Sequence, residues 1–414
     1  MPHSFSPVIV AAKRTPIGTF QGSLSSFKGH ELGSITIRAL NLTQEVDEVI
    51  MGCVLSAAQG QAPARQAALH AGLKNSTSCT TINKVCGSGM KAIFTVCDQI
   101  RLHHINLAIA GGMESMTNAP YMLDRARGGY RAAHGILLDH LYRDGLEDPY
   151  HKNEKGAYRL MGEFAEETAS LYNFHRHEQE QFVLESLGYY QQASSKGYFD
   201  FELFPVECTD HKGNSTVIHQ DEPPTRVKPE KFSQLSAAFR KDGTVTAATS
   251  SPLSDGAAAL GIASHEFALK KGLIPLAKIV GYCSYGQQPE HFTTAPIGAT
   301  KKLLHQTGWT IDDIDLFEIN EAFALVPMAV MKDLNIPRSK VNIHGGSCVL
   351  GHHIPRSKVN IHGGSCVLGH PIGTSGARIV VTLVHALIQK GCKRGIAAIC
   401  IGGGEATAIA LEVT

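Results

Sequence analysis

Two stretches of the chain share one alternation of apolar and polar positions. Residues 85–115 open on glycine and serine, continue with apolar residues at helical spacing, and pass through a short polar link into an apolar run with paired glycines. Residues 373–406 repeat this order. The positions on one helical face of the first stretch are Met90, Ile93, Phe94, Cys97 and Ile100. Each stretch is therefore predicted to form a helix followed by a strand.

The predicted strands are apolar at almost every position, which is typical of parallel sheets covered by helices on both faces. We therefore predict an α/β protein of two related halves, a duplicated fold. The pattern alone leaves a second interpretation open, namely two unrelated strand–helix units.

A more polar region separates the halves. It is rich in Arg, Lys, His, Gln and Tyr, with helices predicted within residues 159–174 and 176–197. A strand is expected within residues 244–264, where the chain returns to the first half. This gives a first half of residues 1–121 plus 254–274, an inserted domain of residues 122–253 that could cover a ligand, and a second half of residues 275–414.

Composition excludes several classes. The chain has 414 residues, 43% hydrophobic and 18% charged, with a net charge of +1, so no global field favours nucleic acid or membrane surfaces. No apolar run approaches the ~20 residues of a membrane span, and the N-terminal sequence lacks the pattern of a secretory signal. The ten cysteines include no CxxC pair, which disfavours a zinc site and a disulfide framework. We expect a cytoplasmic protein without a metal.

One block is written twice. Residues 336–352 return letter for letter as residues 354–370, with only His353 between them. Each copy ends in Gly-His, but only His370 is followed by the Pro-Ile-Gly that leads into the predicted helix. An insertion of this length cannot enter a packed core without leaving backbone groups unpaired. We therefore assign any chemistry to His370 and expect the extra copy to loop out at the surface or to be an artefact of the residue list.

Two cysteines stand where chemistry is plausible. Cys86 precedes two glycines at a predicted helix start, where amides and the helix dipole favour a thiolate nucleophile. Cys400 ends a predicted strand against three glycines, whose N–H groups can face an oxyanion. Each could instead be a buried structural cysteine. Similarly, His370 could act as a base beside a thiol or be simply solvated, and Asn320-Glu321 could be functional or a helix cap.

Taken together, the motifs resemble a known family. "NKVCGSGMKA", "GGMESMTNAPY", "DGTVTAATSSPLSDGAAAL", "NEAFA", "GHPIGTSGAR" and "CIGGGEATA" occur in this order. With them the chain resembles the thiolase family over nearly its whole length, and most closely its acetyl-CoA C-acetyltransferases. The resemblance implies αβαβα layers with two five-stranded mixed sheets, an inserted loop domain and a homotetramer. It also implies conversion of two acetyl-CoA into acetoacetyl-CoA and CoA, with no metal or other cofactor.

The resemblance also implies roles for single residues. Cys86 would accept the acyl group, and His370 would take its proton and later help to stabilise the enolate oxygen. Cys400 would remove the α-proton of the second acetyl-CoA. Asn320 would hold a water beside His370, and the N–H groups of Cys86 and Gly402 would form a second oxyanion site. Positions that would line the path of CoA or the acyl pocket are Met161, Arg226, Phe239, Ala247, Ser251, Phe292 and Phe323.

Three alternatives remain beside this interpretation. A broad-chain 3-ketoacyl-CoA thiolase of fatty-acid degradation would share the motifs. A decarboxylating ketosynthase is disfavoured, because such sites pair one cysteine with two histidines. A silent CoA- or lipid-binding relative should have lost a catalytic residue, yet Cys86, Asn320, His370 and Cys400 are all present.

Overall fold

The computed structural model describes residues 5–132, 134–209, 213–334 and 358–413. The elements of the first half are β1 (Pro7–Arg14), β2 (Gly18–Thr19), α1 (Gly29–Ala39), β3 (Glu48–Gly52), α2 (Pro63–His70), β4 (Ser78–Ile82), α3 (Ser88–Arg101), β5 (Leu107–Ser115), β12 (Ser254–Ser264) and α8 (His265–Lys271). Those of the second half are β13 (Ala277–Gly286), η4 (Pro289–Thr294), α9 (Ala295–Thr307), η5 (Ile311–Asp313), β14 (Leu316–Ile319), α10 (Leu325–Asp333), α11 (Ser365–Leu368), α12 (Ile372–Lys390), β15 (Arg394–Ile401) and β16 (Glu405–Glu412).

The strand order confirms the two related halves. The order β1-β12-β5-β3-β4 in the first half matches β13-β16-β15-β14 in the second, and in each half the first two pairings are antiparallel and the next is parallel. Beyond β14, Val359 forms a parallel bridge with Phe317. Pairing of β1 with β13 joins the two sheets into one ten-stranded sheet, in which β2 lies beside β12.

The sheet is mixed, although the apolar strands favoured a parallel one. β5 runs parallel to β3 but antiparallel to β12. It is apolar because helices cover both of its faces, whichever way its neighbours run. The strand expected within residues 244–264 begins only at Ser254, because Pro252 has no backbone N–H that could donate a hydrogen bond to a neighbouring strand.

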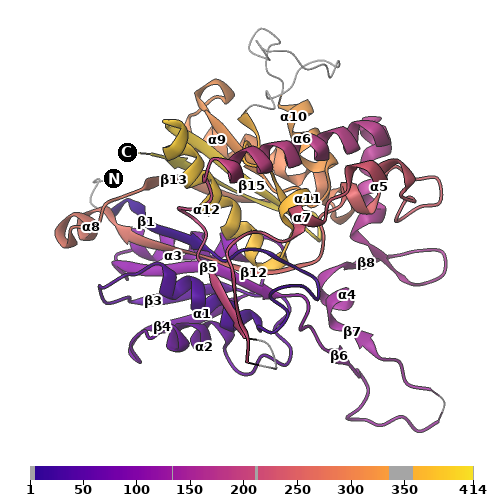
Figure 1. Ribbon diagram of the computed structural model, residues 1–414, viewed down its shortest axis with the longest axis horizontal. Helices are drawn as coiled ribbons and strands as arrows, with labels where there is room; N and C mark the ends of the chain where they lie inside the picture. Colours follow the sequence, from indigo (N-terminus) through magenta and orange to yellow (C-terminus); the bar gives the residue numbers. More distant parts are fainter. Residues whose placement is uncertain (1–4, 133, 210–212, 335–357, 414) are drawn as a thin grey trace.

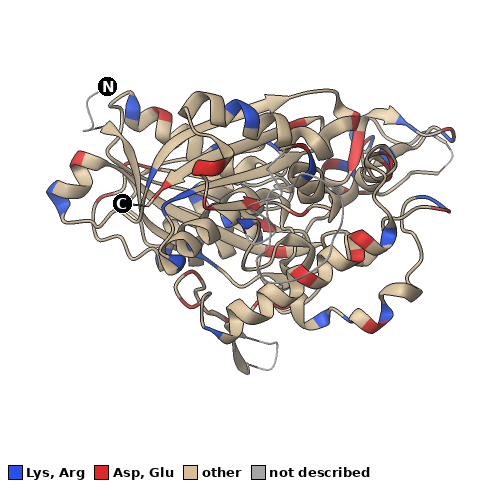
Figure 2. Ribbon diagram, turned by 90° about the horizontal axis from the view of Figure 1, so that it is seen from above, with Lys and Arg blue, Asp and Glu red and all other residues tan. Residues whose placement is uncertain are grey.

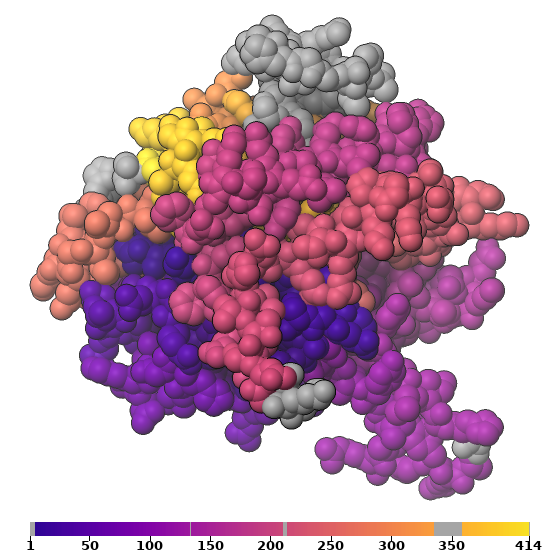
Figure 3. Space-filling view, viewed as in Figure 1, coloured from indigo at the N-terminus to yellow at the C-terminus, as the bar shows by residue number. Residues whose placement is uncertain are grey.

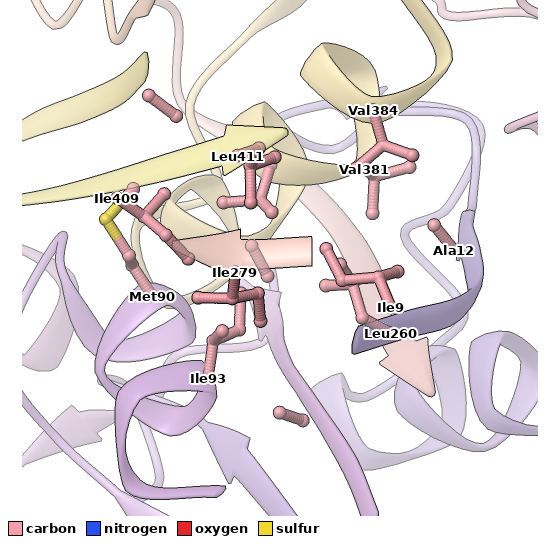
Figure 4. Close-up of a cluster of buried hydrophobic side chains, with 14 of the residues drawn as sticks. Ile9, Ala12, Met90, Ile93, Leu260, Ile279, Val381, Val384, Ile409 and Leu411 are labelled. Atoms are coloured by element: carbon pink, nitrogen blue, oxygen red, sulfur yellow. The ribbon is translucent and has the colours of Figure 1, made fainter. Parts of the chain in front are cut away.

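The helices form layers around the two halves of the sheet. α1 packs on the outer face of the first half and α9 on that of the second, while α3 and α12 lie between the halves (Figure 1). Figure 4 shows the core of this inner layer: Met90 and Ile93 of α3 and Val381 and Val384 of α12 meet strand residues such as Ile279 and Leu411. α12 is long and apolar enough to cross a membrane, but 83% of that window is buried inside the fold, as in a core helix.

The region between the halves contains the two predicted helices. Its elements are β6 (Tyr121–Met122), β7 (Leu138–Asp139), α4 (His140–Gly145), β8 (Glu147–Lys152), β9 (Tyr158–Leu160), α5 (Met161–Tyr172), α6 (Arg176–Ser195), β10 (Val206–Thr209), β11 (Ser215–Ile218), α7 (Pro223–Arg226), η2 (Pro229–Gln234) and η3 (Ala247–Thr249). α6 lies across the front of the second half, and the segment around β6 and β7 projects as an arm (Figures 1 and 3). The domain bounds drawn from the sequence stay a prediction.

Candidate active site

Two helix starts meet at the centre of the molecule. A Cβ on Gly376 of α12 would lie 2.7 Å from the backbone N of Met90 and 3.4 Å from the carbonyl oxygen of Cys86. A Cβ on Gly89 of α3 would lie 2.8 Å from the backbone N of Ala377. Only glycines permit this approach of two backbones. The start of α12, which His370 precedes, is thus held against the start of α3, which Cys86 precedes.

A strained turn presents Cys86. Val85 has φ +47°, a left-handed conformation that is rare for a β-branched residue and that is characteristic of functional turns. The turn is closed by bonds from the N–H of Gly87 to the Lys84 carbonyl at 3.1 Å and from the Ser88 hydroxyl to the Val85 carbonyl at 2.6 Å.

The resting form of Cys86 differs from the sequence-based expectation. Burial raises the pKa of the Cys86 thiol to about 11, while the backbone N–H groups of Gly402 and of Cys86 itself, directed at the sulfur, act in the opposite direction. Burial thus acts against the thiolate expected at this helix start, because the loss of hydration outweighs the stabilisation by the amides. The same two N–H groups are the ones expected to form an oxyanion site.

Cys400 is the second sulfur of the site. It is 1% exposed near the end of β15, and burial raises its pKa, with a further rise from the neighbouring Cys86. The structure therefore brings the two cysteines close enough for the charge of one to oppose the charge of the other.

His370 is buried and its Nδ1 is engaged by Ser375. Nδ1 lies 2.6 Å from Ser375 Oγ, and the Ser375 hydroxyl also lies 3.1 Å from the carbonyl of Pro371, which can only accept. With the Ser375 hydrogen on that carbonyl, Oγ accepts from Nδ1–H and Nε2 is a lone pair. Among the described residues Nε2 has no hydrogen-bond partner. Burial lowers the pKa of His370 to about 3, assisted by the positive charge of Arg378. The ring is a neutral base.

Asn320 follows β14 and is fully buried. Its backbone N–H donates to the Ala398 carbonyl at 2.9 Å, two residues before Cys400, and its side-chain oxygen accepts from the Ser365 hydroxyl. Within the described part of the chain, Asn320 Nδ2 has no partner. The site thus contains one unengaged buried donor and one unengaged buried acceptor, Asn320 Nδ2 and His370 Nε2.

Several residues expected to line the substrate path surround this centre. A Cβ on Gly402 would lie 3.3 Å from Met161 Sδ, so Met161 covers that loop. Phe239 meets Phe323 edge to face at 6.0 Å between ring centroids. The N–H of Ser251 donates to the carbonyl of Ala322, next to Phe323, at 2.9 Å.

Other residues of that set lie at different depths. Phe292 is 3% exposed, in the same apolar cluster as Cys400, and meets Phe164 edge to face at 6.4 Å. Ala247 is exposed in η3. The Arg226 side chain is 60% exposed and pairs with Glu222, so it lies at the surface.

Sequence reasoning missed a buried carboxylate and a ring near the centre. Glu114 is fully buried and accepts from the N–H groups of Val54, Leu55 and Gly373 at 3.0, 3.1 and 2.9 Å, and burial raises its pKa to about 7. It thereby ties the first half to the start of α12. Tyr150 lies over the glycine loop, 3.4 Å from where a Cβ of Gly403 would be. Glu114 was visible within "GGMES", but nothing in the sequence singled out Tyr150.

The second copy of the repeated block supplies the contacts to the site. Asn360 accepts from the N–H of Ile319 and donates to its carbonyl, both at 2.8 Å, beside Asn320. The first copy, with His352, lies outside the described residues, and so does the expectation that it loops out or is an artefact.

The profile of the thiolase N-terminal domain matches residues 7–266, and that of the thiolase C-terminal domain matches residues 273–357 and 353–413. The chain belongs to the thiolase family. In this thiolase the C-terminal profile is matched in two overlapping parts, and the second part begins at His353, the residue between the two copies of the repeated block.

Relatives of this thiolase are similar over nearly their whole length. A probable acetyl-CoA acetyltransferase of Dictyostelium discoideum is 44% identical over 412 residues, 98% of this chain and 94% of that protein. The acetyl-CoA acetyltransferase of Saccharomyces cerevisiae is 42% identical, covering 98% of each chain. Among solved structures, the acetyl-CoA acetyltransferase of Bacillus anthracis matches with a TM-score of 0.90 at 38% identity, covering 99% of each chain. A thiolase of Ascaris suum in complex with coenzyme A matches with a TM-score of 0.87 at 39% identity, covering 99% of this chain and 100% of that one.

Proposed function

We propose that this thiolase is an acetyl-CoA C-acetyltransferase, which condenses two acetyl-CoA reversibly to acetoacetyl-CoA and CoA. The observation that carries the proposal is the convergence on the Cys86 sulfur of two backbone N–H groups and a second buried thiol, Cys400. The relatives are named for this activity, and one structural neighbour is a complex with coenzyme A. A silent binding protein would not need the unengaged base on His370.

The acyl-transfer half-reaction begins with a neutral Cys86 thiol and a neutral His370 ring. His370 Nε2 takes the Cys86 proton as the sulfur attacks the thioester carbonyl of acetyl-CoA. The N–H groups of Cys86 and Gly402 stabilise the oxyanion of the tetrahedral intermediate. The departing CoA thiolate takes the proton of Cys400 and leaves as free CoA, so the site then holds acetyl-Cys86, a protonated His370 and a Cys400 thiolate.

The condensation half-reaction uses the protonated His370 and the Cys400 thiolate that acyl transfer leaves in the site. The raised pKa of Cys400 makes its thiolate a strong base, as the weak carbon acid of a thioester requires. The enolate oxygen accepts from protonated His370 and from a water held by Asn320 Nδ2. The enolate carbon attacks acetyl-Cys86, and the expelled Cys86 thiolate recovers its proton from His370. Cys400 keeps the α-proton, so both thiols return to their starting form, and no step needs a metal or prosthetic group.

The surroundings support further parts of the proposal. CoA would enter between Met161, Phe239, Ser251 and Phe323. The arm around β6 and β7 carries exposed Tyr121, Leu123, Ile136 and Leu137, which supports subunit contacts in a homotetramer (Figure 3). Basic and acidic residues alternate along the ribbon in Figure 2, which fits a protein that binds neither nucleic acid nor membrane. The cysteines of the described residues are all free thiols, which suits a reducing cytoplasm.

Cleavage of acetoacetyl-CoA by the purified protein with free CoA, followed by loss of ultraviolet absorbance, tests the activity. Peptide mass spectrometry after incubation with acetyl-CoA tests the intermediate, and we expect an added acetyl group on Cys86. No cleavage, or acetylation confined to other residues, would contradict the proposal.

A further inference from the structure

Arg378 is a charged residue in the middle of the apolar core helix α12. It is 1% exposed, and a buried guanidinium costs free energy unless it is paired and hydrogen-bonded. Its carboxylate neighbour Glu318 lies only loosely against it, with 3.9 Å from Nη1 to Oε2. Its Nη2 donates instead to Ser365 Oγ at 2.9 Å. The closer contact of this charge is therefore a hydroxyl that belongs to the site.

Ser365 passes this contact to Asn320 in one direction only. Its hydroxyl has one hydrogen, which it donates to Asn320 Oδ1 at 2.5 Å, while Oγ accepts from Arg378. Because Arg378 can only donate, Asn320 Oδ1 is the acceptor that these two partners offer to the Ser365 hydrogen. This contact holds the Asn320 amide with its oxygen toward Ser365. Its Nδ2, which is unpaired among the described residues, is left for the substrate side.

The same guanidinium acts on the second member of this oxyanion site. Its positive charge reinforces the effect of burial on His370, which keeps the ring neutral in the resting protein. Arg378 thus acts on Asn320 through Ser365 and on His370 through space.

We propose that Arg378 and Ser365 are positioning residues for the condensation step, which orient the Asn320 amide so that Nδ2 holds the water that donates to the enolate oxygen. This rests on the proposed function. Without the Ser365 hydroxyl the amide can turn over, and its carbonyl oxygen would then replace the N–H that holds this water. Acyl transfer to Cys86 uses backbone N–H groups and should not depend on this amide orientation.

Ser365→Ala separates the two steps. Thiolysis of acetoacetyl-CoA reports on the carbon–carbon step, whereas exchange of labelled CoA into acetyl-CoA needs acylation of Cys86 alone. We expect kcat of thiolysis to fall by about 10- to 100-fold, less than the loss of an oxyanion donor itself, with KM and the exchange rate within about twofold of wild type. Thr382→Val is the matched control. It removes another buried hydroxyl of α12, the helix that carries Arg378, and this hydroxyl donates to Glu202 at 3.2 Å. This variant should change neither the kcat of thiolysis nor the exchange rate.

Each outcome has one meaning. An equal fall of exchange and thiolysis, or an unchanged kcat in Ser365→Ala with an active wild type, overturns this inference alone. A wild type that exchanges CoA but does not cleave acetoacetyl-CoA overturns the proposed function and this inference with it. Arg378→Gln should also lower kcat of thiolysis, but it removes a charge that acts on His370 as well, so Ser365→Ala decides the question.

Discussion

Gly376 on α12 lies so close to Met90 on α3 that a Cβ there would be 2.7 Å from the Met90 backbone N. This contact sets the distance between the two helix starts that carry Cys86 and His370. A side chain at this point must push the helices apart, because the atom that it meets belongs to the backbone and cannot rotate away.

Gly376→Ala should therefore affect stability and activity together. We expect a loss of about 1–3 kcal/mol in the free energy of unfolding, as for overpacked cores, and a fall in thiolysis of about 100-fold from misplaced groups. Gly188→Ala is the control, because Gly188 lies inside α6 with nothing within 4 Å of an added Cβ. It should stabilise the protein by about 0.5–1 kcal/mol without loss of activity. Denaturant unfolding measures both, and a neutral Gly376→Ala would refute the contact.

The two cysteines should fail in different ways. Cys86→Ala should abolish acetylation of the protein by acetyl-CoA and with it all turnover. Cys400→Ala should leave acetylation of Cys86 measurable while condensation and thiolysis are lost, because only the α-proton transfer lacks its base. Peptide mass spectrometry and a thiolysis assay decide this. Acetylation found at Cys400 and never at Cys86 would reverse the two roles.

The two copies of the repeated block allow a matched pair of variants. His370→Ala should abolish thiolysis, because His370 alone is followed by the segment that contains Ser375 and α12. His352→Ala makes the identical chemical change in the other copy and should leave kcat/KM within about twofold of wild type, because no Pro-Ile-Gly follows His352. Loss of activity in His352→Ala with an active His370→Ala would assign the chemistry to the first copy.

The pKa values of Cys86 and His370 predict how Cys86 reacts with an alkylating agent at different pH values. Iodoacetamide attacks thiolates, and a thiol pKa of about 11 means that the thiolate fraction is small at neutral pH and grows with pH. Alkylation at Cys86 should thus rise about tenfold per pH unit from pH 7 to 9 without a plateau. Since burial lowers the pKa of His370 to about 3, no histidine-like step is expected from this ring between pH 6 and 7. A plateau below pH 8, read by peptide mass spectrometry, would indicate a resting thiolate–imidazolium pair.

Phe292 should limit the length of the acyl chain. Its ring is buried against Phe164 in the cluster that includes Cys400, so it forms a rigid wall. We expect kcat/KM to fall by at least about tenfold from four-carbon to six-carbon 3-ketoacyl-CoA, and 2-methylacetoacetyl-CoA to be cleaved slowly. Phe292→Met, with an adaptable side chain, should narrow the ratio between the two chain lengths. Equal values for four, six and eight carbons in the wild type would indicate a broad degradative thiolase.

The sequence alone determined the elements and the members of the site. The pattern of apolar and polar positions predicted α3, α5, α6 and α12. In α3 the apolar residues repeat at the helical period because one face is buried, whereas α12 is buried at nearly every position. The glycines and the order of the motifs predicted that Cys86, Cys400, Asn320 and His370 belong to one thiolase site.

Only the tertiary structure decided their states. Ser375 engages Nδ1 of His370, and a chain of contacts from Arg378 through Ser365, 13 positions away, to Asn320, a further 45 positions away, orients the amide. The thiol form of Cys86 follows from burial by segments remote in the chain. Hydrogen-bond direction and hydration depend on distances between such segments, and a local pattern records residue types but not those distances.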